Sequence, residues 1–437
     1  MPMANNFQHA LYSRADPGER VGYRTVEAGA PPDSPAWQDA MARLGIQLST
    51  AGVRAVLWFQ GTYLSTDLFG VQRLDEAGGL KRGYSRGIPG MEALLALMRE
   101  GSNGLPPFSG GQKPPFRDEE QIKKLIDEQA VDAGNFTAAY VEQFKRSVNR
   151  DVSRPILCVR SLWSSEHHHV GRARAAVQFL NKLRTICTDL RIGTGDRVLV
   201  QAHGQAGLVL ALLSNLLAPG PSSGRDRFCH LLRSSLQQGG DASEDALRPT
   251  DLESLESLLP ASQALNGAAL DIVTYGTPVR YGWDPSGLGK LLHIVNHRPM
   301  RTDGKRWLAK MELPQITMEM PIAWGGDYVQ QLAVAGCDAV PSSPEAQAAN
   351  KALWELLEPY DGFERWLECA RKSVRCPIDG ACLLVDYKDT GTPEAGTARD
   401  HVYGHAAYTR LNAMLFNTTE LVHAFYVPSG SQASVSS

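Results

Sequence analysis

A strand and a helix without a polar face, joined by one sharp turn, leave this chain few ways to fold. Residues 197–202 form an apolar run of strand length that stops at His203-Gly204-Gln205. Residues 208–217 follow as a predicted helix that is apolar on nearly every side. Such a helix is stable only when neighbours cover most of its surface, as they do where helices pack on a sheet. This pair of elements therefore predicts an α/β core.

Further apolar runs of strand length alternate with helix-length segments along the chain. This alternation is typical of a mostly parallel central sheet with helices on both faces. The predicted strands are residues 53–59, 156–159, 197–202, 270–275, 291–295 and 382–386. The predicted helices are residues 171–190, 208–217, 346–373 and 411–425.

The length of 437 residues exceeds that of most single domains. We expect one enlarged α/β domain over residues 1–437 with two excursions from the sheet. The first covers residues 68–150, where stretches rich in glycine and proline separate helical pieces. The second covers residues 219–266, is rich in serine, glycine and aspartate, and is expected to form a cap or lid.

Composition excludes several classes of protein. A formal net charge of -3 gives no general attraction to phosphate backbones, so no nucleic-acid partner is expected. No run approaches 18 apolar residues, and residues 1–17 lack the apolar core of a signal peptide, so we expect a cytoplasmic protein without a transmembrane segment. The seven scattered cysteines fit reduced thiols better than a disulfide framework. Nothing in the sequence indicates the oligomeric state.

Residues 202–206 read Ala-His-Gly-Gln-Ala and occupy the place of the G-x-S-x-G nucleophile elbow. The stretch 198–217 resembles the elbow strand and helix of the α/β-hydrolase superfamily, as found in serine esterases and lipases. Residues 57–62 resemble the oxyanion segment of that family, and residues 271–278 resemble its strand that ends in G-T-P. Gly404-His405 follows the last predicted strand, where the family keeps its catalytic histidine. The resemblance implies carboxylic-ester hydrolysis of a small-molecule ester or acyl substrate, without a cofactor.

Gly204 departs from the family, because the resemblance places the nucleophilic serine at this position. Without a hydroxyl no alkoxide forms, so the chain as written is expected to be a very poor serine hydrolase. Three explanations stay open: an engineered removal of the nucleophile, a natural pseudo-enzyme that binds a small acyl or aromatic ligand, or a different mechanism run by a His-Asp pair.

The resemblance implies that His405 is the general base, with His401 as the nearest rival. The acid that orients it should come from the connection after residues 291–295. There Asp327 and Asp338 both stand beside glycines, as in a tight functional turn. Asp327 is preferred, Asp338 comes next, and Asp386 at the end of the last strand is third.

The remaining site residues are also implied by the resemblance. An oxyanion hole needs two backbone N–H groups aimed at one point, and these are expected from Gln205 and from Thr62 or its neighbour Tyr63. Tyr63, His203 and Trp163 are expected to contact the substrate. Trp283 follows the G-T-P turn and is a further candidate for an apolar acyl pocket.

Two local patterns resemble a metal site and a phosphate-binding loop, but the surrounding sequence supports neither. Three consecutive histidines, residues 167–169, cannot easily converge on one metal ion, so we expect the run to open the helix near Gly171 and expect no metal site. Residues 204–207 precede a helix as a phosphate loop does, but no G-x-G-x-x-G or G-K-S/T pattern accompanies them. Nucleotide binding is therefore not expected.

Overall fold

The central sheet has seven strands, and every neighbouring pair that the structure describes is parallel. This computed structural model describes residues 12–13, 21–26, 29–59, 119–132, 134–163, 168–220, 223–237, 264–297, 326–327, 329–330, 344–357, 376–387 and 404–427. Across the sheet the strands are β2 (Val21–Thr25), β9 (Ala381–Asp386), β7 (Lys290–Asn296), β6 (Ala269–Tyr275), β5 (Arg197–His203), β3 (Val53–Phe59) and β4 (Leu157–Ser161). A separate antiparallel pair joins β1 (Tyr12–Ser13) to β8 (Cys376–Pro377).

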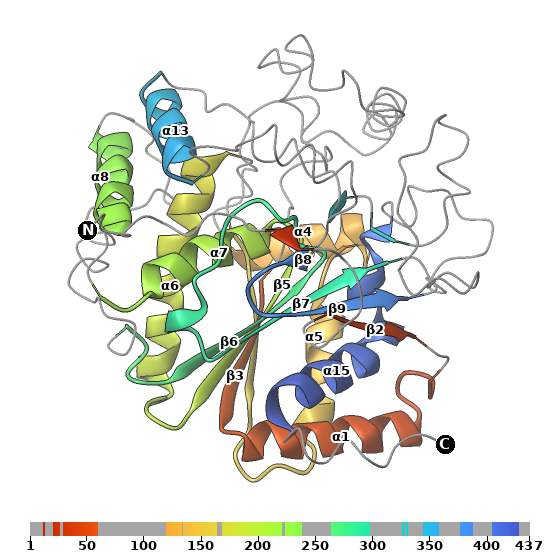
Figure 1. Ribbon diagram of the computed structural model, residues 1–437. Helices are drawn as coiled ribbons and strands as arrows, with labels where there is room; N and C mark the ends of the chain where they lie inside the picture. The colour runs from red at the N-terminus through yellow and green to blue at the C-terminus, as the bar shows by residue number, and fades with distance from the viewer. Residues whose placement is uncertain are drawn as a thin grey trace, which may run out of the picture.

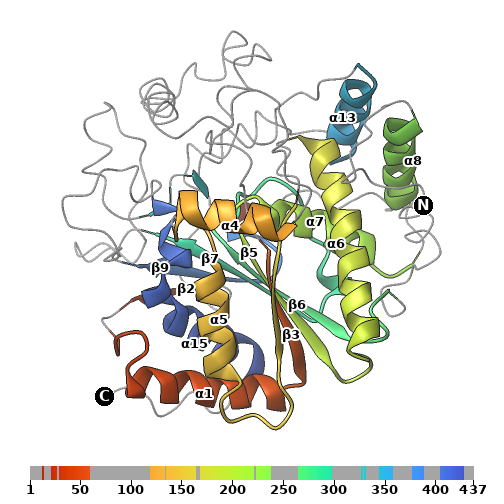
Figure 2. The same cartoon turned by 180° about the vertical axis from the view of Figure 1, so that it is seen from behind.

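Helices cover both faces of the sheet, as Figures 1 and 2 show from opposite sides. One face carries α6 (His169–Asp189) and α7 (Ala206–Leu217), and the other carries α1 (Pro35–Thr50), α5 (Ala138–Val148) and α15 (Met414–Tyr426). Outside α6 lie α13 (Pro344–Leu357) and α8 (Ser223–Gln237), which pack on each other. Helix α4 (Glu119–Ala130) precedes α5. The predicted α/β class with a mostly parallel sheet is confirmed.

Strand β3 shows why the central strands are apolar throughout. All seven of its residues are buried, because alternate side chains enter the two opposite cores. Phe59 stacks on Phe179 of α6 with ring centroids 4.1 Å apart. Trp58 faces the other way and meets Phe144 of α5 edge-on at 4.8 Å.

The helical layers include residues that the sequence pattern assigned to excursions. Helix α5 lies inside the range 68–150 but packs against α1 and β4, so residues 138–148 belong to the layer that covers the sheet. Helix α8 lies inside the range 219–266 and packs against α13 and α6. The cap or lid role of both ranges stays a prediction.

The strand order places a topological switch point beside β5. From β3 the chain crosses outward to β4, whereas from β5 it crosses the other way to β6 and then β7. In open parallel sheets, ligands bind outside the carboxyl ends of the strands at such a point. The turn at Gly204 follows the carboxyl end of β5 and therefore lies there. In the described part of the chain, no helix is both long and apolar enough to span a membrane.

Candidate active site

Gly204 and Gln205 form the turn between β5 and α7, and Gly204 has a φ of +55°, a conformation that costs little only for glycine. The end of β6 and the residues after it fix this turn. The Gly204 N–H donates to the Tyr275 carbonyl at 2.8 Å, and the Thr277 hydroxyl donates to the Gly204 carbonyl at 2.9 Å. The backbone therefore turns sharply at the carboxyl edge of the sheet, and these two hydrogen bonds hold the turn in place.

His405 and Asp327 form a buried pair. The imidazole Nδ1 of His405 lies 2.7 Å from Asp327 Oδ2, and the aspartate side chain is fully enclosed. Asp327 comes from the connection after β7 and His405 from the segment after β9, as expected for the residues that the resemblance singles out. Asp386, the third candidate acid, ends β9, and its carbonyl accepts the Val26 N–H.

The pair faces Gly204. A Cβ atom built on Gly204 would lie 2.7 Å from Nε2 of His405, so a side chain at this position would point directly at the imidazole. Asp327, His405 and residue 204 therefore lie in sequence, from carboxylate to imidazole to the turn. The distance is also shorter than real Cβ atoms allow, so a side chain at 204 would require His405 to move back.

Asp327 is held by hydrogen bonds beyond the one to His405. Its Oδ2 also accepts the Tyr408 hydroxyl at 2.8 Å, and its Oδ1 accepts the Gln330 N–H at 2.8 Å. Burial, followed by the Asp327 charge, raises the pKa of Tyr408 well above its usual value, so this hydroxyl keeps its proton and remains a donor. With three donors the carboxylate is fixed in one orientation and stabilised as an anion.

Asn296, the last residue of β7, connects the two halves of the pair. Its carbonyl accepts the Asp327 N–H at 3.1 Å, and its N–H donates to the Tyr408 hydroxyl at 2.7 Å. Its side-chain amide donates to the Gly404 carbonyl at 2.9 Å. One residue at the end of a rigid strand therefore positions the aspartate, the tyrosine and the histidine-bearing loop.

Gly276, directly after β6, must lack a side chain for the pair to form. Its φ is +59°, and a Cβ there would collide with Asp327, His405 and Tyr408.

We expect Gly276→Ala to lower the free energy of unfolding by about 2–4 kcal/mol, because the backbone strain and the overlap add up. Urea denaturation measures this loss. Gly195→Ala is the matched control, since Gly195 has a φ of +90° but no atom within 4 Å of the added Cβ. Equal losses in both variants would contradict the collision.

His203 packs against His405 on the strand side of the turn. Its ring centroid lies 4.1 Å from that of His405, and its Nε2 lies 3.0 Å from the His405 carbonyl oxygen. Phe136 meets the same ring edge-on at 6.2 Å. Burial, reinforced by the charge of His405, lowers the pKa of His203 to about 3. The ring is therefore neutral near pH 7, and its Nε2–H supports the backbone of His405.

This lowered pKa makes stability depend on pH. The unfolded chain protonates His203 below about pH 6.5, whereas the folded chain leaves it neutral down to about pH 3. Because the unfolded state binds more protons in that window, the free energy of unfolding falls as pH falls, by up to about 1.4 kcal/mol per pH unit from this residue. We expect His203→Gln to flatten the curve between pH 6 and pH 4, measured by urea denaturation. His423→Gln, at an exposed position of α15, should keep the native slope; parallel curves for native and His203→Gln chains would refute the assignment.

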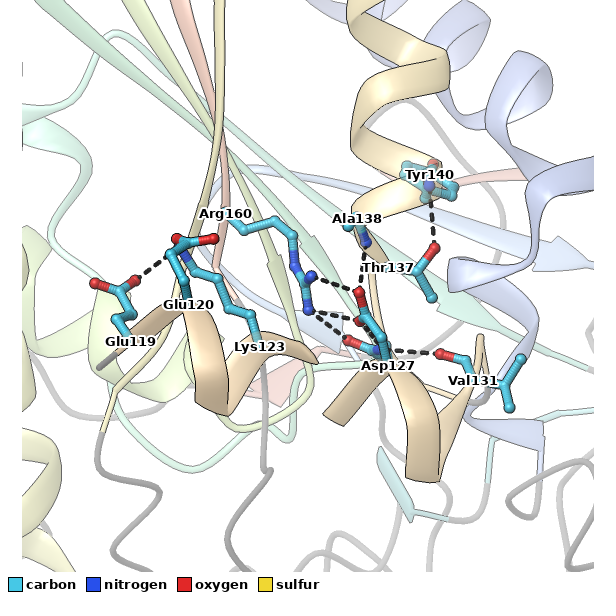
Figure 3. A network of polar contacts seen from close by, with 10 residues as sticks. Glu119, Glu120, Lys123, Asp127, Val131, Thr137, Ala138, Tyr140 and Arg160 are labelled. Carbon is cyan, nitrogen blue, oxygen red and sulfur yellow. Dashed lines mark hydrogen bonds and ion pairs between the residues drawn. The ribbon is translucent and has the colours of Figure 1, made fainter. Parts of the chain in front are cut away.

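A polar network joins α4 to β4 and to the start of α5 (Figure 3). Asp127 of α4 accepts two hydrogen bonds of 2.9 Å from Arg160 of β4, and another of 2.9 Å from the Ala138 N–H at the start of α5. The turn after α4 then meets Thr409, which accepts the Gly134 N–H at 3.0 Å and donates to the Asp132 carbonyl at 2.7 Å. Hydrogen bonds from Thr409 therefore hold the loop that carries His405 to the turn that follows α4.

Gln205 and Trp163 are both buried. Gln205 follows Gly204 at the N-cap position of α7, and its side chain makes no capping hydrogen bond to the helix. Its side chain accepts a hydrogen bond from Arg172 of α6. Trp163 and Trp283 belong to the apolar core between the sheet, α6 and α7. Thr62, Tyr63, Asp338 and His401 lie outside the described residues, so their predicted roles stay predictions.

Four contributors to this site were missed by sequence reasoning: Tyr408, Asn296, Thr277 and Arg172. Tyr408 stands three residues after His405 and Asn296 ends a predicted strand, so both positions carried a usable signal. Arg172 carried none, because arginine on a predicted helix normally faces solvent. Two histidines of the run lie in the described residues and open the helix as predicted: His168 caps α6, accepting the Gly171 N–H at 2.9 Å, and His169 begins it.

Comparison with protein family models, with curated proteins and with solved structures gives no match to this chain. The site must therefore be interpreted from its own geometry. Over the ranges that the structure describes, no group of three or more His, Cys, Asp or Glu side chains could hold a metal ion. The arrangement offers an imidazole that is oriented by a buried carboxylate and faces the turn at Gly204.

Proposed function

We propose that this chain carries the active site of a carboxylic-ester hydrolase of the α/β-hydrolase type, with Gly204 in place of the nucleophilic serine. The observation that carries the proposal is the alignment of Asp327, His405 and the turn at Gly204, with 2.7 Å from Oδ2 to Nδ1 and 2.7 Å from Nε2 to the missing Cβ. Two groups far apart in sequence converge on a residue that lies at the sharp turn after a strand, where the α/β-hydrolase family carries its nucleophile.

In the serine-bearing form each group would have a defined task. The residue 204 hydroxyl would attack the ester carbonyl while His405 Nε2 takes its proton, and His405 would later return that proton to the leaving alcohol. Asp327 would hold the imidazole in the tautomer with hydrogen on Nδ1 and stabilise its charged form. The Gln205 N–H at the start of α7, together with Thr62, would bind the oxyanion. The chain with Gly204 cannot form the acyl-enzyme, so it does not turn over esters by this route.

Covalent labelling tests the proposal. Gly204→Ser should react with diethyl p-nitrophenyl phosphate and gain one diethyl phosphoryl group on residue 204, detected by intact mass and peptide mass spectrometry. Gly204→Ala is the matched control, because it pushes on His405 in the same way but has no hydroxyl. A folded Gly204→Ser chain that stays unlabelled would sink the proposal.

The close approach of His405 favours a second candidate, a non-catalytic protein that binds a small acyl or aromatic ligand. An imidazole 2.7 Å from the missing Cβ fits glycine better than serine, as expected of a site that has settled around its glycine. This alternative predicts that such ligands raise the melting temperature of the native chain while Gly204→Ser remains inactive and unlabelled.

A further inference from the structure

Two cysteines near the edge of the sheet are in direct contact. The thiol of Cys382, in β9, donates a hydrogen bond to the sulfur of Cys376, in β8, and the two Sγ atoms are 2.8 Å apart. Both side chains are buried, with exposed fractions of 0% for Cys376 and 2% for Cys382. The S–S distance of a disulfide is about 2.05 Å, so the two sulfur atoms need to approach by less than about 1 Å to form one.

A sharp bend between β8 and β9 brings the two cysteines together. Six residues of extended chain would span about 20 Å, whereas here the two thiols touch. The bend covers residues 378–380 and ends at Gly380, which has a φ of +75°. A Cβ on Gly380 would lie 2.7 Å from Cγ of Leu291 in β7. The contact between the thiols therefore depends on a backbone conformation that suits glycine and that packs directly on the sheet.

The surroundings of the two thiols are apolar. Cys376 and Cys382 form a small buried cluster with Val21 of β2, Val295 of β7 and Leu384 of β9. Structural zinc sites have four ligands, and within the described ranges no three or more His, Cys, Asp or Glu side chains are grouped so that they could hold a metal ion. The chemistry open to two adjoining thiols in such a cluster is thiol–disulfide exchange.

Strand β8 gives the two thiols a route to solvent. It has two residues, as does its partner β1, and Cys376 lies opposite Ser13 in this short pair. A pair of this length can open locally while the seven-stranded sheet stays intact. Cys382, in contrast, belongs to a strand that is paired on both sides, with β2 and with β7. Cys376 is therefore the thiol that an oxidant reaches first.

We propose that Cys376 and Cys382 are a redox-active pair that closes into a disulfide between β8 and β9, with a small-molecule disulfide such as oxidised glutathione as the oxidant. The Cys376 thiolate attacks one sulfur of the oxidant, forming a mixed disulfide and releasing one glutathione. The Cys382 thiolate then attacks the Cys376 sulfur, forming the intramolecular bond and releasing the second glutathione. The two thiol protons pass to the two released glutathione thiolates, so the chain loses two electrons and the oxidant gains them. This chemistry is independent of the hydrolase proposed above.

Peptide mass spectrometry tests the pair directly. Trypsin cuts after Arg375 and Lys388, so one peptide, residues 376–388, holds both cysteines. The full chain is equilibrated with oxidised glutathione or with dithiothreitol, labelled with N-ethylmaleimide and digested without reduction. We expect this peptide to carry two labels after dithiothreitol. After oxidised glutathione we expect it to carry no label and to lack two hydrogen atoms.

The same oxidation is repeated during refolding from urea, when every thiol is accessible. Closure both in the folded chain and on refolding would support the pair and its route through β8. Closure on refolding alone would support the pair and refute the opening of β8. Labels on both cysteines after refolding, or a lasting glutathione adduct on either one, would overturn the proposal.

The melting temperature measures what the disulfide does to the fold. A disulfide restricts the unfolded chain, and one that closes a loop as short as residues 376–382 has a modest effect. We expect the native chain to melt at least about 2 °C higher under oxidising than under reducing conditions, and Cys376→Ala to lose this difference. Each variant is compared with itself, so any packing lost in the substitution cancels.

Cys187→Ala is the matched control, because it removes a fully buried cysteine of α6 and should keep the difference. If Cys376→Ala does not fold, Cys376→Ser replaces it, since serine is closer to cysteine in size and cannot form a disulfide. A difference between the two conditions that persists in the folded variant at residue 376 would overturn the proposal.

Discussion

Replacing Gly204 with serine is expected to raise the rate of hydrolysis of short p-nitrophenyl esters by at least about 10³-fold over the native chain. Loss of the nucleophile from a complete triad costs up to about 10⁶-fold in kcat, and the oxyanion hole and binding account for what remains. The gain should be smaller than that maximum, because His405 must first move back from its place 2.7 Å from the added Cβ.

The measurement is release of p-nitrophenolate from acetate and butyrate esters at neutral pH. Gly204→Ala separates the hydroxyl from the added bulk, and it should stay at the native background. The backbone at residue 204 already has a φ of +55°, so both variants carry the same conformational cost, and any difference between them belongs to the hydroxyl. Equal rates for serine and alanine would show that residue 204 is not the nucleophile position.

Replacing Asp327 with asparagine in the Gly204→Ser chain is expected to lower kcat by about 10⁴-fold. An amide in place of the carboxylate favours the wrong imidazole tautomer and no longer stabilises the imidazolium, which is the effect seen for triad aspartates in general. In the native chain the carboxylate oxygens accept hydrogen bonds from His405, Tyr408 and Gln330. In asparagine one of the two oxygens is replaced by an NH₂ group, which cannot accept a hydrogen bond.

Steady-state kinetics on the same esters measures this loss, and circular dichroism checks that the variant folds. Asp196→Asn is the control, because Asp196 lies just before β5 at the far end of the strand from Gly204 and should leave kcat unchanged. A decrease of less than about tenfold for Asp327→Asn would show that Asp327 is not the residue that orients His405.

Much of this architecture follows from local sequence patterns. Buried parallel strands read as continuous apolar runs, so β3 was predicted with its observed bounds and β5, β6, β7 and β9 to within one residue at each end. The turn at Gly204 was predicted from the strand, the small residues and the apolar helix α7 together. The order of elements and the neighbouring glycines singled out Asp327 and Asp338, with Asp327 preferred, and among the described residues Asp327 lies against His405.

The features that local sequence patterns did not predict depend on partners far along the chain or on charged residues in the interior. Strand β2 is short and partly exposed, and its position at the sheet edge comes from β9, far along the chain. Helix α5 was assigned to an excursion because a long glycine- and proline-rich region precedes it. Nothing in the local pattern indicated that α5 packs on the sheet. Arg172 and Arg280 are charged residues in the interior, where composition rules place apolar ones.

The pairing of β2 with β9 also sets the order in which the molecule can assemble. During synthesis, residues 21–25 emerge early but have no partner until residues 382–386 leave the ribosome. Strand β9 must then enter between β7 and β2, closing a loop that contains most of the chain, and such closures slow folding. The elbow at Gly204 can form within the early half of the sheet, whereas the loop that carries His405 follows β9. We therefore expect the two halves of the site to form at different times, with His405 positioned after β9 has docked.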